Sequence, residues 1–106
     1  MSTSERTIEY VLGQLSSLPG IRVRRMFGEY ALYMDDVVIG LICDDQIFIK
    51  YTDTGKEFAQ NRYEEGYAYP GAKPSMNITE SIDDAVFFTS LVSMTATLLP
   101  KTNRKK

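Results

Sequence analysis

Histidine is absent from this 106-residue sequence, and cysteine occurs once, at Cys43. Because histidine is the commonest general base and the commonest metal ligand, its absence excludes histidine-based catalytic triads and histidine-containing zinc sites. One cysteine cannot form an internal disulfide, which fits a reducing compartment. No Lys or Arg lies beside Cys43 in the sequence to stabilise a thiolate. We therefore expect a buried small hydrophobic residue there rather than a reactive thiol.

Long hydrophobic runs are also missing. No apolar run approaches the roughly 20 residues that a membrane span needs. The first ten residues, MSTSERTIEY, are polar where a signal peptide has an apolar segment. We therefore expect a cytoplasmic protein without membrane contact. The sequence contains no phosphate-binding loop, dinucleotide fingerprint or cluster of metal ligands. We accordingly expect no cofactor, no metal and no enzymatic activity.

The charge is small overall but unevenly distributed. The net charge is −2, and four of the 12 basic residues lie in residues 101–106. Residues 1–100 therefore carry 8 basic against 14 acidic residues, a net charge of −6. We expect residues 1–100 to form a single domain and residues 101–106 to form a disordered basic tail. An acidic body is a poor match for phosphate backbones, so nucleic-acid binding is not favoured.

Two acidic dipeptides, Asp35-Asp36 and Asp44-Asp45, separate three strand-like segments at residues 29–34, 37–43 and 46–51. Two-residue gaps between strands predict tight hairpins, and aspartate tolerates the left-handed backbone that such turns require. The dipeptides lie at opposite ends of the middle strand, roughly 20 Å apart at about 3.3 Å per residue. We therefore interpret them as turn residues rather than as a shared metal site.

Periodicity and capping residues predict the remaining elements. A helix with apolar residues at helical spacing follows Ser2-Thr3-Ser4-Glu5 and stops at Pro19-Gly20, and residues 21–26 alternate like a half-exposed strand. Next we expect a short helix that begins at Thr52 or Asp53 and ends at Gly66, and then a short strand over residues 76–78. The last element is a long helix that begins at Thr79 or Ser81 and ends at Pro100. The expected fold is α+β: an antiparallel meander sheet of four to five strands, with an N-terminal, a short middle and a long C-terminal helix packed on it.

The middle strand of the meander has no polar face. Strict alternation assigns its residues to two apolar faces, one with Val37, Ile39 and Leu41, and the other with Val38, Gly40 and Ile42. A strand that is apolar on both sides must be covered on both sides. The first and last helices could cover one face each, or a second copy of the protein could cover the remaining face, so a homodimer also fits.

The run Met26-Phe27-Gly28-Glu29-Tyr30-Ala31-Leu32-Tyr33, followed by an acidic turn, an apolar strand and a second acidic turn, resembles the N-terminal domain of the TfoX/Sxy family. That bacterial family is associated with the regulation of competence for DNA uptake. The resemblance implies the fold and a bacterial cytoplasmic setting. Named competence regulators usually join this domain to a C-terminal helical domain, whereas this chain stops at Lys106. The resemblance is therefore to a stand-alone N-terminal domain.

Candidate binding residues lie on a loop and on a strand. The loop after residue 66 is rich in proline and glycine and carries aromatic rings and a cation, which can contact a phosphate, a base or a peptide. Packing of those rings back onto the sheet is an equally good interpretation. The strand over residues 21–26 carries arginines that we interpret first as solvated charges on an edge strand. The candidates for partner binding are Arg22, Arg24, Arg25, Tyr67, Tyr69 and Lys73.

Three functions remain in order of preference. The first is a non-enzymatic regulatory domain that binds another protein, as a monomer or a homodimer. The second is a transcriptional regulator that contacts nucleic acid through the arginines of residues 21–26 and the basic tail. The third is a small-ligand binder or enzyme with a site between Tyr67 and Lys73, which a deep pocket at that place would favour.

Overall fold

The two aspartate dipeptides form the turns that organise the sheet. We describe the chain from a computed structural model, in which residues 3–26 and 29–99 are described. Asp35 and Asp36 have φ angles of 51° and 70°, and Asp44 and Asp45 have φ angles of 53° and 62°. Two successive residues with positive φ are characteristic of the tight hairpin turns whose twist matches that of the strands they join. The predicted role of both dipeptides as turns is confirmed.

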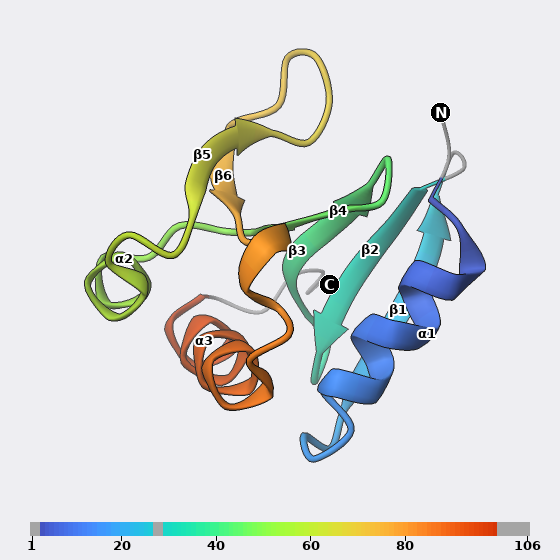
Figure 1. Cartoon of the computed structure of the whole chain (residues 1–106), viewed down its shortest axis with the longest axis horizontal. Coiled ribbons are helices and arrows are strands. Elements are labelled where there is room, and N and C mark those ends of the chain that lie inside the picture. The colour runs from blue at the N-terminus through green and yellow to red at the C-terminus, as the bar shows by residue number, and fades with distance from the viewer. Residues whose placement is uncertain (1–2, 27–28, 100–106) are drawn as a thin grey trace, which may run out of the picture.

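The elements form one antiparallel sheet with helices (Figure 1). The strand order is β1-β2-β3-β4-β6-β5, and the α+β fold predicted from the sequence is confirmed. The sheet has six strands rather than the predicted four to five. Phe27 and Gly28 of the family motif, and the predicted basic tail, lie outside the described residues. The elements in chain order are α1 (Glu5–Gln14), β1 (Ile21–Met26), β2 (Glu29–Met34), β3 (Val37–Cys43), β4 (Gln46–Ile49), α2 (Asp53–Ala59), β5 (Glu64–Tyr67), β6 (Pro74–Asn77), the 3-10 helix η1 (Thr79–Ser81) and α3 (Ala85–Leu98).

The additional strand comes from a segment that was predicted to be helical. Helix α2 ends at Ala59 because Gln60 has a φ angle of 54°, which a right-handed helix cannot accommodate. Gly66, predicted to end that helix, instead lies in β5, which pairs with β6. The predicted start of the long helix at Thr79 or Ser81 is also wrong, since these residues form η1. Helix α3 begins after Asp84, whose carboxylate accepts a hydrogen bond from the Phe87 amide.

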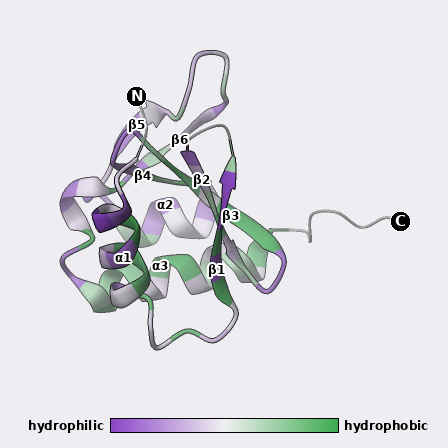
Figure 2. Cartoon of the chain, turned by 90° about the vertical axis from the view of Figure 1, so that its right-hand side faces the viewer, coloured by the Kyte–Doolittle hydropathy of each residue, from purple (hydrophilic) through white to green (hydrophobic). Residues whose placement is uncertain are grey.

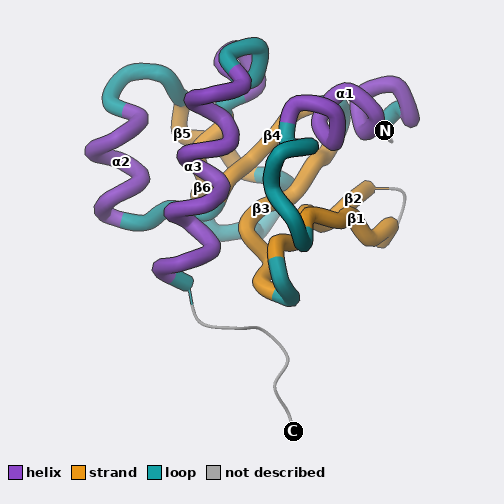
Figure 3. The backbone as a smooth tube through the Cα atoms, turned by 90° about the horizontal axis from the view of Figure 1, so that it is seen from below, coloured by secondary structure: helices purple, strands orange, loops and turns teal. Residues whose placement is uncertain are grey.

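All three α-helices pack on the same face of the sheet (Figure 3). One core cluster contains residues of α1, α2 and α3 together with residues of β2, β3, β4 and β6. Hydrophobic segments in Figure 2 accordingly occur both in the strands and in the helices. One of the two predicted arrangements placed the first and last helices on opposite faces of the sheet. This prediction is wrong, because both helices lie on the same face. The buried cluster includes Val11, Leu15, Leu32, Ile42, Ile47, Met76, Phe88 and Leu91.

A bulge in β3 changes which of its residues face the core. Leu32 pairs with Gly40, but the next residue of β2, Tyr33, pairs with Val38, so Ile39 has no partner in β2. An extra residue reverses the alternation of the strand that contains it. Leu41 consequently lies on the face opposite Ile39, and the predicted grouping of these two residues on one face is wrong.

Glycine at position 40 is required by the neighbouring strand. A Cβ atom at this position would lie 2.1 Å from the carbonyl oxygen of Phe48 and 3.2 Å from the Cα of Ile49. Both contacts are with the backbone of β4, which cannot move without breaking its pairing with β3. The sheet can therefore form in this register only with glycine at position 40.

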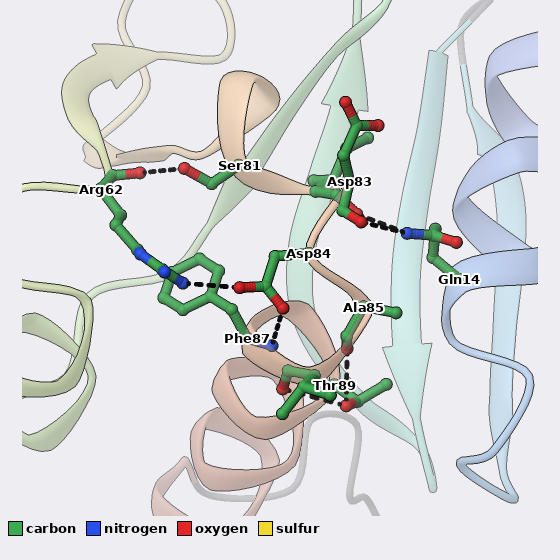
Figure 4. A network of polar contacts seen from close by, with 10 residues as sticks. Gln14, Arg62, Ser81, Asp83, Asp84, Ala85, Phe87 and Thr89 are labelled. Carbon is green, nitrogen blue, oxygen red and sulfur yellow. Dashed lines mark hydrogen bonds and ion pairs between the residues drawn. The ribbon is translucent and has the colours of Figure 1, made fainter.

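A network of polar contacts fixes the segment between β6 and α3 (Figure 4). Arg62 donates a hydrogen bond to the Asp84 carboxylate at 3.1 Å, and Ser81 donates to the Arg62 carbonyl at 2.9 Å. From the opposite side, the Gln14 amide of α1 donates to the Ile82 carbonyl at 2.7 Å. These contacts hold α1 and the α2–β5 connection against the start of α3.

We expect Gly40→Ala to destabilise the protein by about 2 kcal/mol or more, because the new methyl group collides with backbone atoms. Gly13 of α1 provides the matched control, since a Cβ there meets nothing within 4 Å. Gly13→Ala should stabilise the protein by about 0.5–1 kcal/mol, because alanine favours helix. Urea unfolding of both variants measures these changes, and equal stabilities for the two alanine variants would contradict the role of Gly40.

Asp45 ties the start of α1 to the turn between β3 and β4. Its Oδ1 atom accepts hydrogen bonds from the Ser4 amide and the Thr7 hydroxyl, each at 2.8 Å. The bond from Ser4, followed by that from Thr7, lowers the pKa of Asp45 below its ordinary value of 3.8. Ser4 itself caps α1 by accepting from the Thr7 amide at 3.3 Å.

We expect NMR titration to give Asp45 a folded-state pKa below 3.8. The folded state then binds fewer protons than the unfolded state in that range, so this stabilisation is complete above the unfolded pKa and is lost as pH falls through the folded pKa. Asp45→Asn should remove this part of the acid dependence of the unfolding free energy. Glu9→Gln is the control. It removes a carboxylate from the exposed side of α1 and should leave the acid dependence of the unfolding free energy unchanged. An unchanged acid dependence in Asp45→Asn would refute the assignment.

Candidate functional site

One face of the sheet carries none of the described helices, and we call it the open face. Strand pairing aligns Ala31, Leu41 and Phe48 in a row across β2, β3 and β4 on this face. Ala31 and Phe48 are buried, whereas Leu41 is only half-buried. The loop between β5 and β6, residues 68–73, projects from the sheet in Figure 1. Its residues line two cavities together with Leu41.

The loop owes its shape to a turn over residues 69–72. Ala72 donates its amide hydrogen bond to the Tyr69 carbonyl at 3.0 Å, and Gly71 has a φ angle of 87°. Pro70 at the second position and a glycine with positive φ at the third are characteristic of a type II turn. The turn presents Tyr69 at its first position, and the Tyr69 side chain remains 55% exposed.

The first cavity has a volume of about 620 Å³, and we call it the Glu29 cavity. Its polar side chains include Glu29, whose Oε1 atom accepts hydrogen bonds from the Thr3 hydroxyl at 2.6 Å and the Asp44 amide at 3.1 Å. Asp44 also lines this cavity, so its polar part is acidic. The apolar part of the lining is formed by Met26, Leu41, Ala68, Tyr69 and Pro70.

Cys43 lines the Glu29 cavity and is buried, as predicted. Burial, followed by the negative charges of Glu29 and Asp44, raises the pKa of the Cys43 thiol. A raised pKa lowers the thiolate fraction at neutral pH, and the thiolate is the reactive form. Cys43 therefore contributes to the packing of the cavity wall.

The second cavity has a volume of about 580 Å³, and we call it the lysine cavity. It is lined by Lys50 and Lys73 and, among the described residues, by no acidic side chain. Leu41, Ala68 and Tyr69 line both cavities, so the two are neighbours under the same loop. Burial, followed by the positive charge of Lys73, lowers the pKa of the Lys50 ammonium group.

The bulge in β3 also positions Lys50. The Lys50 amide donates a hydrogen bond at 2.9 Å to the carbonyl of Ile39, the residue that has no partner in β2. The next residue, Tyr51, also lines the lysine cavity, and its ring meets that of Tyr63 edge to face at 5.8 Å. Burial, followed by the negative charge of Glu65, raises the pKa of Tyr51 to about 12. Its hydroxyl group stays protonated at neutral pH and can donate a hydrogen bond.

The structure brings only some of the predicted binding residues together. Tyr69 and Lys73 line the lysine cavity, whereas Tyr67 is 60% exposed at the end of β5. Arg22 forms an ion pair with Asp36 at 3.1 Å and lies 4.5 Å from the centre of the Tyr33 ring. Arg24 and Arg25 are exposed, and they pair with Ala31 and Tyr30, respectively, on opposite faces of the sheet. The three arginines therefore do not form one patch.

Sequence reasoning missed Lys50 and Leu41 as site residues. The signal for Lys50 was its position after Ile49, which places it on the face opposite the buried Ile47 and Ile49. The sequence could not predict that Leu41 lies on the open face, because a strand that is apolar on both faces gives no pattern from which the bulge at Ile39 could be recognised.

The described residues offer neither a metal-ligand cluster nor a membrane-spanning helix. Over residues 3–26 and 29–99, no group of three or more Cys, Asp or Glu side chains is arranged to hold a metal ion. In the same part of the chain, no helix is both long enough and apolar enough to cross a membrane.

The fold and the site define a class: a small α+β domain with helices on one face of its sheet and a loop over the other. The chain belongs to the TfoX N-terminal domain family, whose pattern matches residues 13–93. The resemblance predicted from the Met26-to-Tyr33 motif is confirmed, and the family supports a regulatory type of domain. The chain is also 40% identical over 106 residues to an uncharacterised 12.7 kDa protein in the trpE 5′ region of Spirochaeta aurantia. The alignment covers 100% of this chain and 91% of that protein.

Replacing either cavity lysine with methionine should stabilise the protein, because each replacement removes the repulsion between the half-buried Lys50 and the exposed Lys73. We expect a gain of about 0.5 kcal/mol or less for Lys50→Met and Lys73→Met, since water screens partly exposed charges. Lys56→Met is the control, because the Lys56 ammonium lies over the Tyr51 ring at 5.3 Å and its removal loses a favourable contact. Thermal unfolding compares the three variants, and a loss of stability in both cavity variants would contradict the repulsion.

Proposed function

We propose that this protein is a non-enzymatic cytoplasmic regulatory domain that acts by binding another protein through the loop and the open face. The partner surface that fits is an apolar segment flanked by acidic side chains. The family assignment supports the regulatory role. The mode of action rests on the exposed apolar side chains around the loop.

The observation that carries the proposal is a pair of exposed side chains beside the open face, which the described helices leave free. Tyr69 is 55% exposed and Met26 is 40% exposed, whereas Tyr67 lies on the helix side, because its neighbour Glu65 pairs with the core residue Met76. Tyrosine and methionine are enriched at protein interfaces, where they bury large areas. Arg24 and Lys73 are exposed on the same side and supply the positive charge that an acidic partner needs.

Contact with nucleic acid is a weaker alternative. A phosphate backbone requires several cations on one surface, and its binding weakens steeply with salt. Arg22 is already paired with Asp36, and Arg25 lies on the face opposite Arg24. The acidic balance of residues 1–100 opposes this alternative as well.

Site-specific photocrosslinking tests the proposal. A photoreactive benzoylphenylalanine replaces Tyr69 in one variant, because Tyr69 is 55% exposed on the loop, and Val86 in the control, because Val86 is 77% exposed on α3, on the helix side of the sheet. We expect protein adducts from position 69 that survive nuclease treatment and that position 86 does not give. An adduct with a second copy of the chain would identify the partner as the protein itself. Adducts that vanish with nuclease, or equal yields from both positions, would overturn the proposal.

A further inference from the structure

We propose that the lysine cavity binds a small amphipathic anion, a molecule with one carboxylate or phosphate group on an apolar body. This site goes beyond the proposed protein contact and does not depend on it. The cavity volume of about 580 Å³ lies within the range of roughly 300–1,000 Å³ that is usual for small-molecule sites.

The described lining of the lysine cavity carries two cations and no anion, and Glu65, whose charge acts on Tyr51, lies outside that lining. Lys50 and Lys73 line one cavity, and no described acidic residue lines it with them. The half-buried Lys50 and the exposed Lys73 repel each other, and this cost is removed when an anion binds between their ammonium groups. The effect of Lys73 on the pKa of Lys50 agrees with such proximity.

An apolar surface lies beside the two lysines. Leu41, Ala68 and the Tyr69 ring line the lysine cavity and continue into the Glu29 cavity. A ligand body that lies over Leu41 would therefore extend from the lysines toward Met26. The protonated Tyr51 hydroxyl adds a hydrogen-bond donor at the lysine end.

The charges around the two cavities also fix the orientation of a bound ligand. Glu29 and Asp44 line only the Glu29 cavity, whereas both lysines line only the lysine cavity. The trough formed by the two cavities is therefore positive at one end and negative at the other, with apolar residues between. An anionic head is attracted to the lysine end and repelled from the Glu29 end, so a ligand with one anionic group has a single favourable orientation.

Binding of two related dyes tests the site. The probes are 8-anilino-1-naphthalenesulfonate, an apolar anion, and N-phenyl-1-naphthylamine, its neutral counterpart. Fluorescence titration of the purified full chain should show that Lys50→Met and Lys73→Met each weaken binding of the anionic dye by about fivefold or more. Both variants should bind the neutral dye as the wild type does. Added salt should weaken binding of the anionic dye more in the wild type than in either variant.

Two further variants make the result specific. Arg6→Met removes one positive charge from α1, on the helix side of the sheet, and should leave binding of both dyes unchanged. Ala68→Trp fills the space shared by the two cavities and should weaken binding of both dyes. Equal affinity for the anionic dye in the wild type and both lysine variants would overturn the proposal, and so would an equal loss in Arg6→Met.

Displacement of the anionic dye then identifies the head group. Decanoate and decyl phosphate carry the same alkyl chain on a carboxylate and a phosphate, and decanol carries it on a neutral hydroxyl group. We expect at least one of the two anions to displace the dye from the wild type at concentrations where decanol does not. Equal displacement by decanol, or no displacement by either anion, would contradict an anion site. Because these measurements use the purified protein alone, their outcome is independent of the crosslinking test.

Discussion

The close approach of the β4 backbone to Gly40 is the constraint on which the rest of the structure depends. The carbonyl of Phe48 occupies the space of a side chain at position 40, and the bulge beside Gly40 leaves Ile39 without a partner in β2. Ile39 then packs into the helix-covered core, and Leu41 turns to the open face. The same bulge offers the Ile39 carbonyl to the Lys50 amide. One irregularity therefore shapes the core and both cavities.

The placement of all three α-helices on one face determines where this protein can bind a partner or ligand. A sheet with apolar residues on both faces must bury both, yet the helices cover only one. The hairpin of β5 and β6 and its loop cover part of the other face and leave two cavities. Like charges gathered in such a cavity reduce stability, and natural proteins accept such a cost mainly at functional sites.

Several features followed from the sequence because their causes are local. Aspartate dipeptides tolerate positive φ, so the two turns of the meander could be predicted from four residues. The helical spacing of apolar residues, which is also a local feature, allowed α1 and α3 to be predicted. Local rules failed between residues 60 and 84, where β5 forms only because β6 pairs with it. They failed again at the start of α3, where Asp84 is held by Arg62 from another segment.

The sequence by itself determined the α+β class, the family, the turns and the loop that carries Tyr69 and Lys73. Each of these depends on residue types and on spacings of a few positions. Only the tertiary structure decided that the helices share one face, that Leu41 points away from them, and that Lys50 meets Lys73 in one cavity. These outcomes depend on contacts between residues far apart in the chain, such as that of Gly40 with Phe48, and such contacts leave no periodic pattern in the sequence.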